Sequence, residues 1–297
     1  MEKENKFIHL FLVPFTGLGN YQGFRGNSWL KNRLTIFEQF VIPSLLNQTN
    51  KKFIIWIAWR REEKFNSIVR KFKKRLESIK ELKFIHTHTG IPFYDDKYED
   101  KEARERLINS LHGALGDLIN ETGEVDYVYM TIQPSDDVYC NTAVEQIQNG
   151  FNNNPNIQAL GFNKGYIMNY PTKELREYNP TTNPPFVTVK FPRDIFIDPL
   201  KHCEYTALKY DIDKYKKDCP CPSHEYYPDV FGDKYKIINE RGFIVGIHGN
   251  NISTTFNHRF TGNIVNQEIL KDFNLYNVPP LKIKYSFKKR IYDFLRS

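Results

Sequence analysis

Two adjacent carboxylates, Asp136 and Asp137, are the residues whose types and spacing most directly indicate chemistry in this chain. They follow the stretch DYVYMTIQP (126–134), whose β-branched and aromatic residues predict a buried strand. Two like charges at a strand end repel each other, so their ionised forms need a cation or several hydrogen bonds. A hard divalent cation would meet this need and would also bind phosphate oxygens. The alternative is a solvated pair, with Asp137 or Asn141 capping the next helix.

The elements that must position this pair alternate between strand and helix along residues 7 to 151. Apolar runs predict strands at 7–15, 51–59, 82–88 and 126–134. Helical patterns occupy 28–49, 62–81, 100–121 and 141–153, with Ser28 as the expected N-cap of the first and Pro43 as a kink within it. This alternation predicts a doubly wound, mostly parallel α/β sheet. Ligands of such sheets bind at the carboxyl ends of the strands, where the acidic pair lies.

The second half of the chain predicts a smaller, mixed sheet region. Strand patterns occur at 157–170, 184–192 and 241–254, with short helical patterns between them. We expect one domain over 1–297, in which 7–151 is the main ligand-binding half, 152–260 adds a second wall and 261–297 is a basic tail.

Composition and charge restrict the class of protein. The chain has 297 residues, of which 40% are hydrophobic and 26% charged, as in an ordinary globular protein. A net charge of +7 favours an anionic partner such as a phosphorylated substrate, a polyanion or a membrane surface. No apolar run reaches the roughly 18 residues of a membrane-spanning helix, and FIHLFLVPF (7–15) is typical of a first strand rather than a signal peptide. We therefore expect a cytoplasmic protein without a transmembrane segment.

The four cysteines are too sparse for a disulfide scaffold in a chain of this length. Cys219 and Cys221 are separated by a single proline, which lacks the two-residue gap of common zinc sites. Free thiols are therefore favoured over a structural zinc site.

Further candidate site residues lie on either side of the acidic pair. His248 follows the apolar run FIVGI, and a neutral imidazole there suits a third ligand of Mn²⁺, with an ordinary hydrogen-bonded histidine as the alternative. Asn250 and Asn251 are candidates for binding phosphate or sugar hydroxyls, although asparagines are also common turn formers. Arg25 and Arg33 suit pairing with phosphate or carboxylate, and the alternative for Arg33 is a salt bridge on the helix face.

Three stretches resemble a known family. WLKNRLTIFEQFVIPSLLNQTNKKFIIWIA (29–58) resembles the rhamnosyltransferase family, PSDDVY (134–139) stands at its aspartate-rich turn, and GIHGNNIST (246–254) resembles its late His/Asn segment. The α/β half that ends in the acidic pair also looks like the GT-A glycosyltransferase architecture. This sequence departs from the family by carrying Ser135 where an aspartate is expected.

The resemblance implies roles for individual residues. Asp137 would be the direct metal ligand, Asp136 its supporting partner and His248 a late ligand, with Mn²⁺ or Mg²⁺ as the ion. Phe15 and Thr16, at the end of the first strand, would meet the nucleotide base.

The activity that this resemblance implies is a metal-dependent, inverting transfer of a sugar in polysaccharide biosynthesis. The donor would be a dTDP-, UDP- or GDP-linked sugar, with rhamnose implied by the family alone, and the acceptor a glycan hydroxyl. Such a reaction needs a base, for which Glu225 is the first candidate and Asp229 the second. The alternative is that both are exposed charges favoured at a helix N-terminus.

Two other interpretations concern partners. A metal-dependent nuclease or nucleic-acid-binding protein would use the basic residues, but these are dispersed and no nucleic-acid motif accompanies them. The tail from Lys282 to Arg296 alternates apolar residues with cations, a pattern that suits peripheral contact with an anionic membrane. A helix docked on the protein core is the alternative for this tail.

Overall fold

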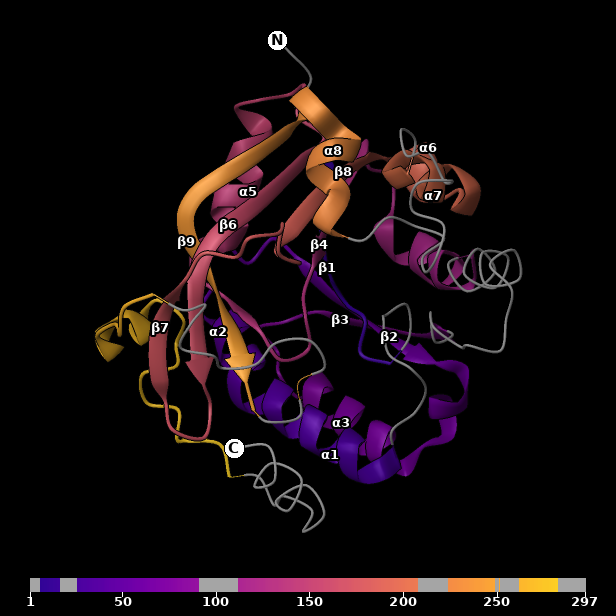
Figure 1. Cartoon of the computed structure of the whole chain (residues 1–297). Helices are drawn as coiled ribbons and strands as arrows, with labels where there is room; N and C mark the ends of the chain where they lie inside the picture. The colour runs from indigo at the N-terminus through magenta and orange to yellow at the C-terminus, as the bar shows by residue number, and fades with distance from the viewer. Residues whose placement is uncertain are drawn as a thin grey trace, which may run out of the picture.

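A computed structural model describes residues 6–16, 26–90, 112–207, 224–248, 251 and 262–282 (Figure 1). Its nine strands form one sheet in the order β3-β2-β1-β4-β8-β6-β9-β5, with β7 paired to β6. The strands are β1 (Phe7–Val13), β2 (Ile54–Arg60), β3 (Phe84–Gly90), β4 (Tyr127–Ile132), β5 (Val138–Tyr139), β6 (Ala159–Asn169), β7 (Glu174–Tyr178), β8 (Val187–Pro192) and β9 (Tyr235–Ile247).

The helical segments alternate with these strands. The α-helices are α1 (Gly26–Ile36), α2 (Ile42–Leu46), α3 (Ser67–Glu77), α5 (Ala143–Asn152), α6 (Arg193–Phe196), α7 (Pro199–Ala207) and α8 (Tyr227–Phe231), and residues 112–122 are also helical. The remaining helical turns are the π-helix η1 (Phe37–Val41) and the 3₁₀ turns η2 (Arg61–Phe65), η3 (His224–Tyr226), η4 (Gly232–Lys234) and η5 (Gln267–Lys271). No helix among the described residues is both long and apolar enough to cross a bilayer.

The predicted α/β architecture is confirmed. Strands β3, β2, β1 and β4 are parallel neighbours. The apolar runs of β1, β2 and β4 are largely buried on both faces, as is typical of parallel sheets, whereas residues 84–88 of β3 alternate between buried and half-buried. Beyond β4 the directions become mixed, because β8 is antiparallel to both β4 and β6, whereas β9 is parallel to β6. The strands of the second half therefore extend the same sheet, and within the described residues they form no separate C-terminal sheet.

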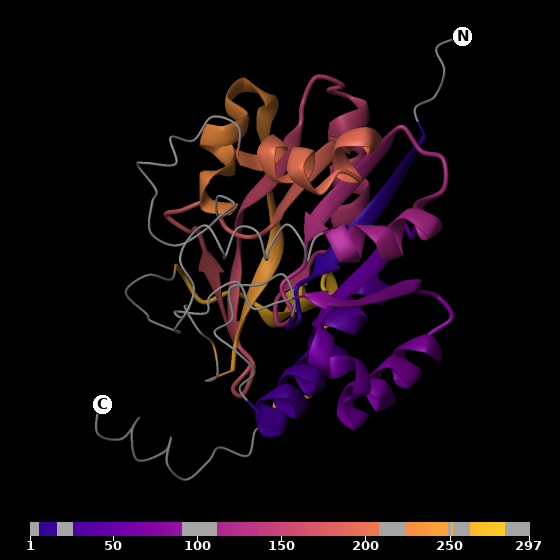
Figure 2. The same ribbon diagram turned by 90° about the vertical axis from the view of Figure 1, so that its right-hand side faces the viewer.

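Helices cover both faces of the sheet (Figures 1 and 2). One apolar cluster joins the sheet to α1, α3 and α5, and includes Phe11, Leu34, Phe72 and Ile147. The other joins it to the helix at 112–122 and to α6 and α8. These two clusters hold the strand ends in place.

The helix that precedes β2 is irregular next to Pro43, where the sequence predicts a kink. Pro43 has no N–H to donate and its ring crowds the preceding turn. The chain relieves this by widening into η1 immediately before Pro43, with the Ile42 N–H donating to the Phe37 carbonyl. The predicted N-cap at Ser28 is wrong, because α1 already begins at Gly26, whose φ of 88° suits glycine.

A buried polar network crosses the sheet. Hydrogen bonds join His9 Nε2 to Thr131 Oγ1 at 2.7 Å and Thr131 Oγ1 to Thr188 Oγ1 at 2.6 Å. Gln148, on α5, donates to His9 Nδ1 at 3.2 Å. Burial lowers the pKa of His9 to about 3, so the imidazole is neutral in the folded protein at physiological pH.

This network predicts a loss of stability in acid. The pKa of His9 lies below its unfolded value of 6.5, so between about pH 6.5 and 3 the unfolded chain binds the extra proton. As the pH is lowered through this range, the free energy of unfolding should therefore decrease by up to about 1.4 kcal/mol per pH unit through His9 alone. His9→Gln should reduce this slope in urea titrations at pH 7, 6 and 5.

His112 provides the matched control because it is exposed on the helix at 112–122. His112→Gln should leave the slope unchanged. Some slope should remain in His9→Gln, because burial also lowers the pKa values of His86 to about 3 and of His202 to about 4. Equal slopes in wild type and His9→Gln would contradict the prediction.

Candidate functional site

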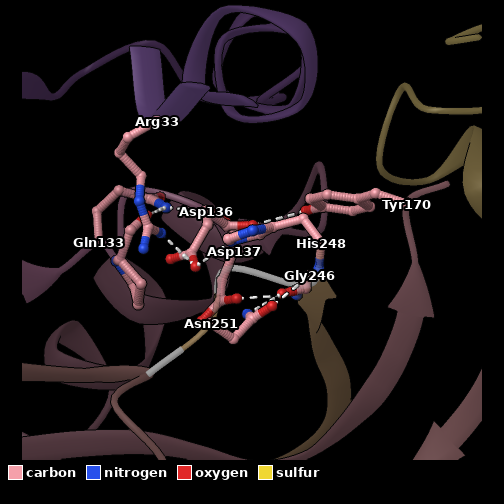
Figure 3. A network of polar contacts seen from close by, with 9 residues as sticks. Arg33, Gln133, Asp136, Asp137, Tyr170, Gly246, His248 and Asn251 are labelled. Carbon is pink, nitrogen blue, oxygen red and sulfur yellow. Dashed lines mark hydrogen bonds and ion pairs between the residues drawn. The ribbon is translucent and has the colours of Figure 1, made fainter. Parts of the chain in front are cut away.

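The acidic pair lies between β4 and β5, and both carboxylates are buried, with 8% of Asp136 and 7% of Asp137 exposed. Two features place it there. Strand β4 ends at Ile132, and β5 then pairs antiparallel with β9, with Val138 opposite Ile244. This pairing brings the pair next to the end of β9, where Gly246 and His248 lie (Figure 3).

Asp136 is held by two partners that are distant in sequence. Its Oδ2 forms an ion pair with Arg33 from α1 and contacts His248 Nε2 at 3.0 Å. Burial raises the pKa of Asp136, but the Arg33 guanidinium and the His248 contact outweigh it and lower the pKa to about 2. Asp136 is therefore ionised and compensated within the protein. Arg33 does form a salt bridge, but a buried one rather than one on the solvated helix face.

Asp137 has a different environment. Its Oδ1 accepts the backbone N–H of Gly246 at 2.9 Å. Burial and the neighbouring Asp136 charge raise the pKa of Asp137 well above its ordinary value. The solvated-cap alternative is wrong, because Thr142 occupies the N-cap position of α5 and both carboxylates are buried.

Side chains of Gln133 and Tyr170 bind the backbone carbonyls of the loop that carries the pair. Gln133 Nε2 donates to the carbonyls of Pro134 and Asp137, both at 2.8 Å. The Tyr170 hydroxyl donates to the Asp136 carbonyl at 2.7 Å, and its ring stacks on Phe40 with centroids 3.7 Å apart. These contacts fix the backbone of the loop at both aspartates.

Ser135 stands where an aspartate was expected. Its Oγ is buried and has no hydrogen-bond partner among the described residues. A buried hydroxyl without a partner is costly, so this position is suited to a ligand that supplies an acceptor or donor.

Of the two predicted asparagines after β9, Asn251 contacts the end of that strand. Asn251 Oδ1 accepts the His248 N–H at 2.8 Å, and its Nδ2 donates to the Gly246 carbonyl at 2.6 Å. Asn251 thus holds the backbone at the end of β9, next to His248. Asn250 lies outside the described residues.

The remaining predicted residues are dispersed. Phe15 is fully buried and stacks on Trp59 at 4.8 Å, and the Thr16 hydroxyl donates to Glu63. The candidate bases lie on a different part of the chain, with Glu225 exposed on η3 and Asp229 exposed on α8.

Some residues considered in the sequence analysis lie outside the described residues. Arg25, Cys219, Cys221 and the tail beyond Lys282 belong to this group. Cys140, by contrast, is a buried free thiol, as expected.

Three residues that organise the site were not predicted from the sequence, namely Gln133, Tyr170 and Gly246. Gly246 did have a signal, because a glycine inside an apolar strand often marks close approach of another group. Gln133 and Tyr170 sit at strand ends without a distinctive pattern.

The described residues provide an incomplete metal site. Among them, no group of three or more His, Cys, Asp or Glu side chains is arranged to hold an ion. Asp136 Oδ2 is already shared by Arg33 and His248, whereas within the described residues the side chain of Asp137 accepts a single hydrogen bond, from the Gly246 N–H. The site therefore fits a cation that takes one carboxylate from the protein and its other ligands from phosphate and water, a common arrangement for Mg²⁺.

Comparisons with known proteins give structural neighbours only. No family model matches the chain, and no curated protein matches it. A crystal structure of S. aureus TarS in complex with UDP-GlcNAc aligns with a TM-score of 0.43 and 11% identity, over 98% of this chain and 71% of that one. The mannosyltransferase PcManGT from Pyrobaculum calidifontis, in complex with GDP-Man and Mn²⁺, aligns with a TM-score of 0.41 and 8% identity, over 85% of this chain and 59% of that one.

Gly246 generates a direct test of the packing around the acidic pair. A Cβ at this position would lie 2.3 Å from the Asp136 carbonyl oxygen and 2.4 Å from the Tyr170 ring. Gly246→Ala must therefore push the loop and the ring apart, and should cost about 1–3 kcal/mol of unfolding free energy in urea titration.

Gly116 is the matched control. It lies exposed in the helix at 112–122, and a Cβ there would meet nothing within 4 Å. Gly116→Ala should stabilise the protein by about 0.5–1 kcal/mol, because alanine is the better helix former. Equal unfolding free energies for the two variants would show that Gly246 is not tightly packed.

Proposed function

We propose that this protein is a glycosyltransferase that uses a nucleotide diphosphate sugar. The observation that carries the proposal is the buried Asp136–Asp137 pair at the carboxyl end of β4, in the parallel part of the sheet. Ligands of such sheets bind at this edge. Two carboxylates with opposite pKa shifts, joined to an arginine and a histidine, are more typical of a reaction site than of a structural turn.

The two carboxylates have separate tasks in this proposal. Asp136 holds Arg33 and His248 in position. Asp137 faces the donor diphosphate and is the protein ligand of a divalent cation, either Mn²⁺ or Mg²⁺. When bound, this cation would neutralise charge on the departing diphosphate. The Ser135 hydroxyl, which has no hydrogen-bond partner among the described residues, would bind a polar group of the nucleotide sugar at the same loop.

The acceptor side lies on the second half of the chain. Glu225 and Asp229 occupy the short helical segment that leads into β9, and both carboxylates are exposed to an incoming acceptor. We propose that Glu225, or Asp229 in its place, removes the proton of a glycan hydroxyl as it attacks the sugar, which gives inversion at the anomeric carbon. Rhamnose as the donor sugar is supported by the family resemblance of residues 29–58 alone.

Nucleotide binding tests the proposal most directly. At about 100 times its dissociation constant, the correct nucleotide should stabilise the fold by about 2.7 kcal/mol and raise the melting temperature. UDP, dTDP and GDP should be compared in the presence of Mn²⁺, with a single-stranded oligonucleotide as the control. No shift with any nucleotide, or a shift with the oligonucleotide alone, would reject the proposal.

Asp137→Asn separates the ligand role from folding. It should remove the part of the nucleotide shift that depends on Mn²⁺, because an amide is a weaker ligand than a carboxylate. Asp126→Asn is the control, since Asp126 is exposed at the opposite end of β4 and accepts the Lys6 N–H. An unchanged Mn²⁺-dependent shift in Asp137→Asn would contradict the assignment.

The base is identified by comparing Glu225→Gln with Asp229→Asn. Loss of the base should lower kcat by about 100-fold or more and leave KM for the donor unchanged. Glu124→Gln, at an exposed position just before β4, is the control. Donor hydrolysis across nucleotide sugars, followed by transfer to the acceptor found, provides the assay. Full activity in both variants would exclude both residues as the base.

A further inference from the structure

Arg33 is an unusual partner for a candidate metal site. It lies on α1, about a hundred residues before the acidic pair, and only 2% of its side chain is exposed. Its guanidinium forms an ion pair with the same Asp136 oxygen that His248 contacts. A buried arginine that loses its partner leaves an uncompensated charge, so this pair is expensive to break.

The ion pair changes what the site can do without a ligand. Adjacent carboxylates attract a divalent cation because their charges add, but here one of the two is already neutralised. The guanidinium also adds a positive charge beside any ion that approaches Asp137. Asp137 alone is one ligand, and single carboxylates hold Mg²⁺ in proteins when substrate phosphates supply further ligands.

We propose that Arg33 is the resident cation of this site, so that the free protein does not retain a divalent cation and the ion binds together with a nucleotide diphosphate. The Arg33–Asp136 ion pair occupies a carboxylate that would otherwise attract the cation. The diphosphate supplies the negative charge and the ligand oxygens in its place. This inference rests on the proposed function for the identity of the ligand, but its first part concerns the free protein only. By linkage, the cation strengthens nucleotide binding by the same factor as the nucleotide strengthens cation binding.

The structure offers a specific variant for this inference. Arg33→Gln removes the charge while keeping a side chain that can donate a hydrogen bond. Asp136 then keeps its contact with His248 but loses the guanidinium charge that compensates it. The variant should lose stability in the absence of metal, and it should gain a site for Mn²⁺ in the absence of nucleotide.

Arg75→Gln is the matched control. Arg75 also pairs with a carboxylate, at 2.5 Å from Glu38 Oε1, but 54% of its side chain is exposed and the pair is remote from the acidic loop in sequence. Surface pairs of this kind contribute little to stability. This variant should melt near the wild-type temperature and should acquire no affinity for Mn²⁺.

Two titrations test the inference on the full chain. Mn²⁺ binding to nucleotide-free protein is followed by electron paramagnetic resonance of the free ion, and the melting temperature is measured in EDTA and in Mn²⁺. Wild type and Arg75→Gln should show no binding at millimolar Mn²⁺. Arg33→Gln should bind Mn²⁺ at least about tenfold more tightly than wild type and should recover part of its lost melting temperature.

The outcomes are distinct. Tight Mn²⁺ binding by nucleotide-free wild type overturns the inference, and this holds even if Arg33→Gln fails to fold. Arg33→Gln that folds and gains no Mn²⁺ affinity also overturns it. If no nucleotide binds under any condition while Arg33→Gln gains Mn²⁺ and wild type does not, the proposed function fails and the role of Arg33 stands.

Discussion

The ion pair between Arg33 and Asp136 is the interaction on which the rest of the site depends. It connects α1, in the first quarter of the chain, to the loop after β4, and the His248 contact adds the end of β9 to the same oxygen. Three elements from distant parts of the chain therefore meet at one carboxylate. A buried charge of this kind is tolerated only with such compensation, because desolvation otherwise favours the neutral form.

This constraint explains the asymmetry between the two aspartates. The pKa of Asp136 is lowered to about 2, whereas the pKa of Asp137 is raised well above its ordinary value. The same burial acts on both, but only Asp136 has Arg33 and His248 as direct partners. One carboxylate is thus part of the scaffold, and the other is left to respond to a ligand.

The surrounding fold holds the Asp136 loop in position relative to η1 and β9. The stacked rings of Phe40 and Tyr170 connect η1 to the carbonyl of Asp136, and Gly246 lacks a side chain where the same carbonyl approaches β9. The widened turn at η1 follows from Pro43, ten residues after Arg33. A local backbone feature of the helix is therefore connected, through the Tyr170 ring, to the loop that carries the acidic pair.

Much of the fold was accessible from the sequence because its signals are local. Continuous apolar runs predicted β1, β2, β3 and β4, and Pro43 predicted the irregular helix, because strand burial and proline sterics act within a few residues. The position of Asp136 and Asp137 at a strand end followed from the same patterns. The two-residue strand β5 and the strand β7 were missed, since neither carries a local pattern that distinguishes it from a loop.

What compensates the acidic pair was decided only by the tertiary structure. The sequence shows that two adjacent carboxylates need positive charge or hydrogen bonds, and it offers Arg33 and His248 only as candidates among other basic residues. The choice of partner depends on the order of strands in the sheet and on the pairing of β5 with β9, which are contacts between residues a hundred positions apart. Electrostatic energy depends on distance through space, so the spacing of charges along the chain shows that the acidic pair needs compensation but does not show which residue provides it.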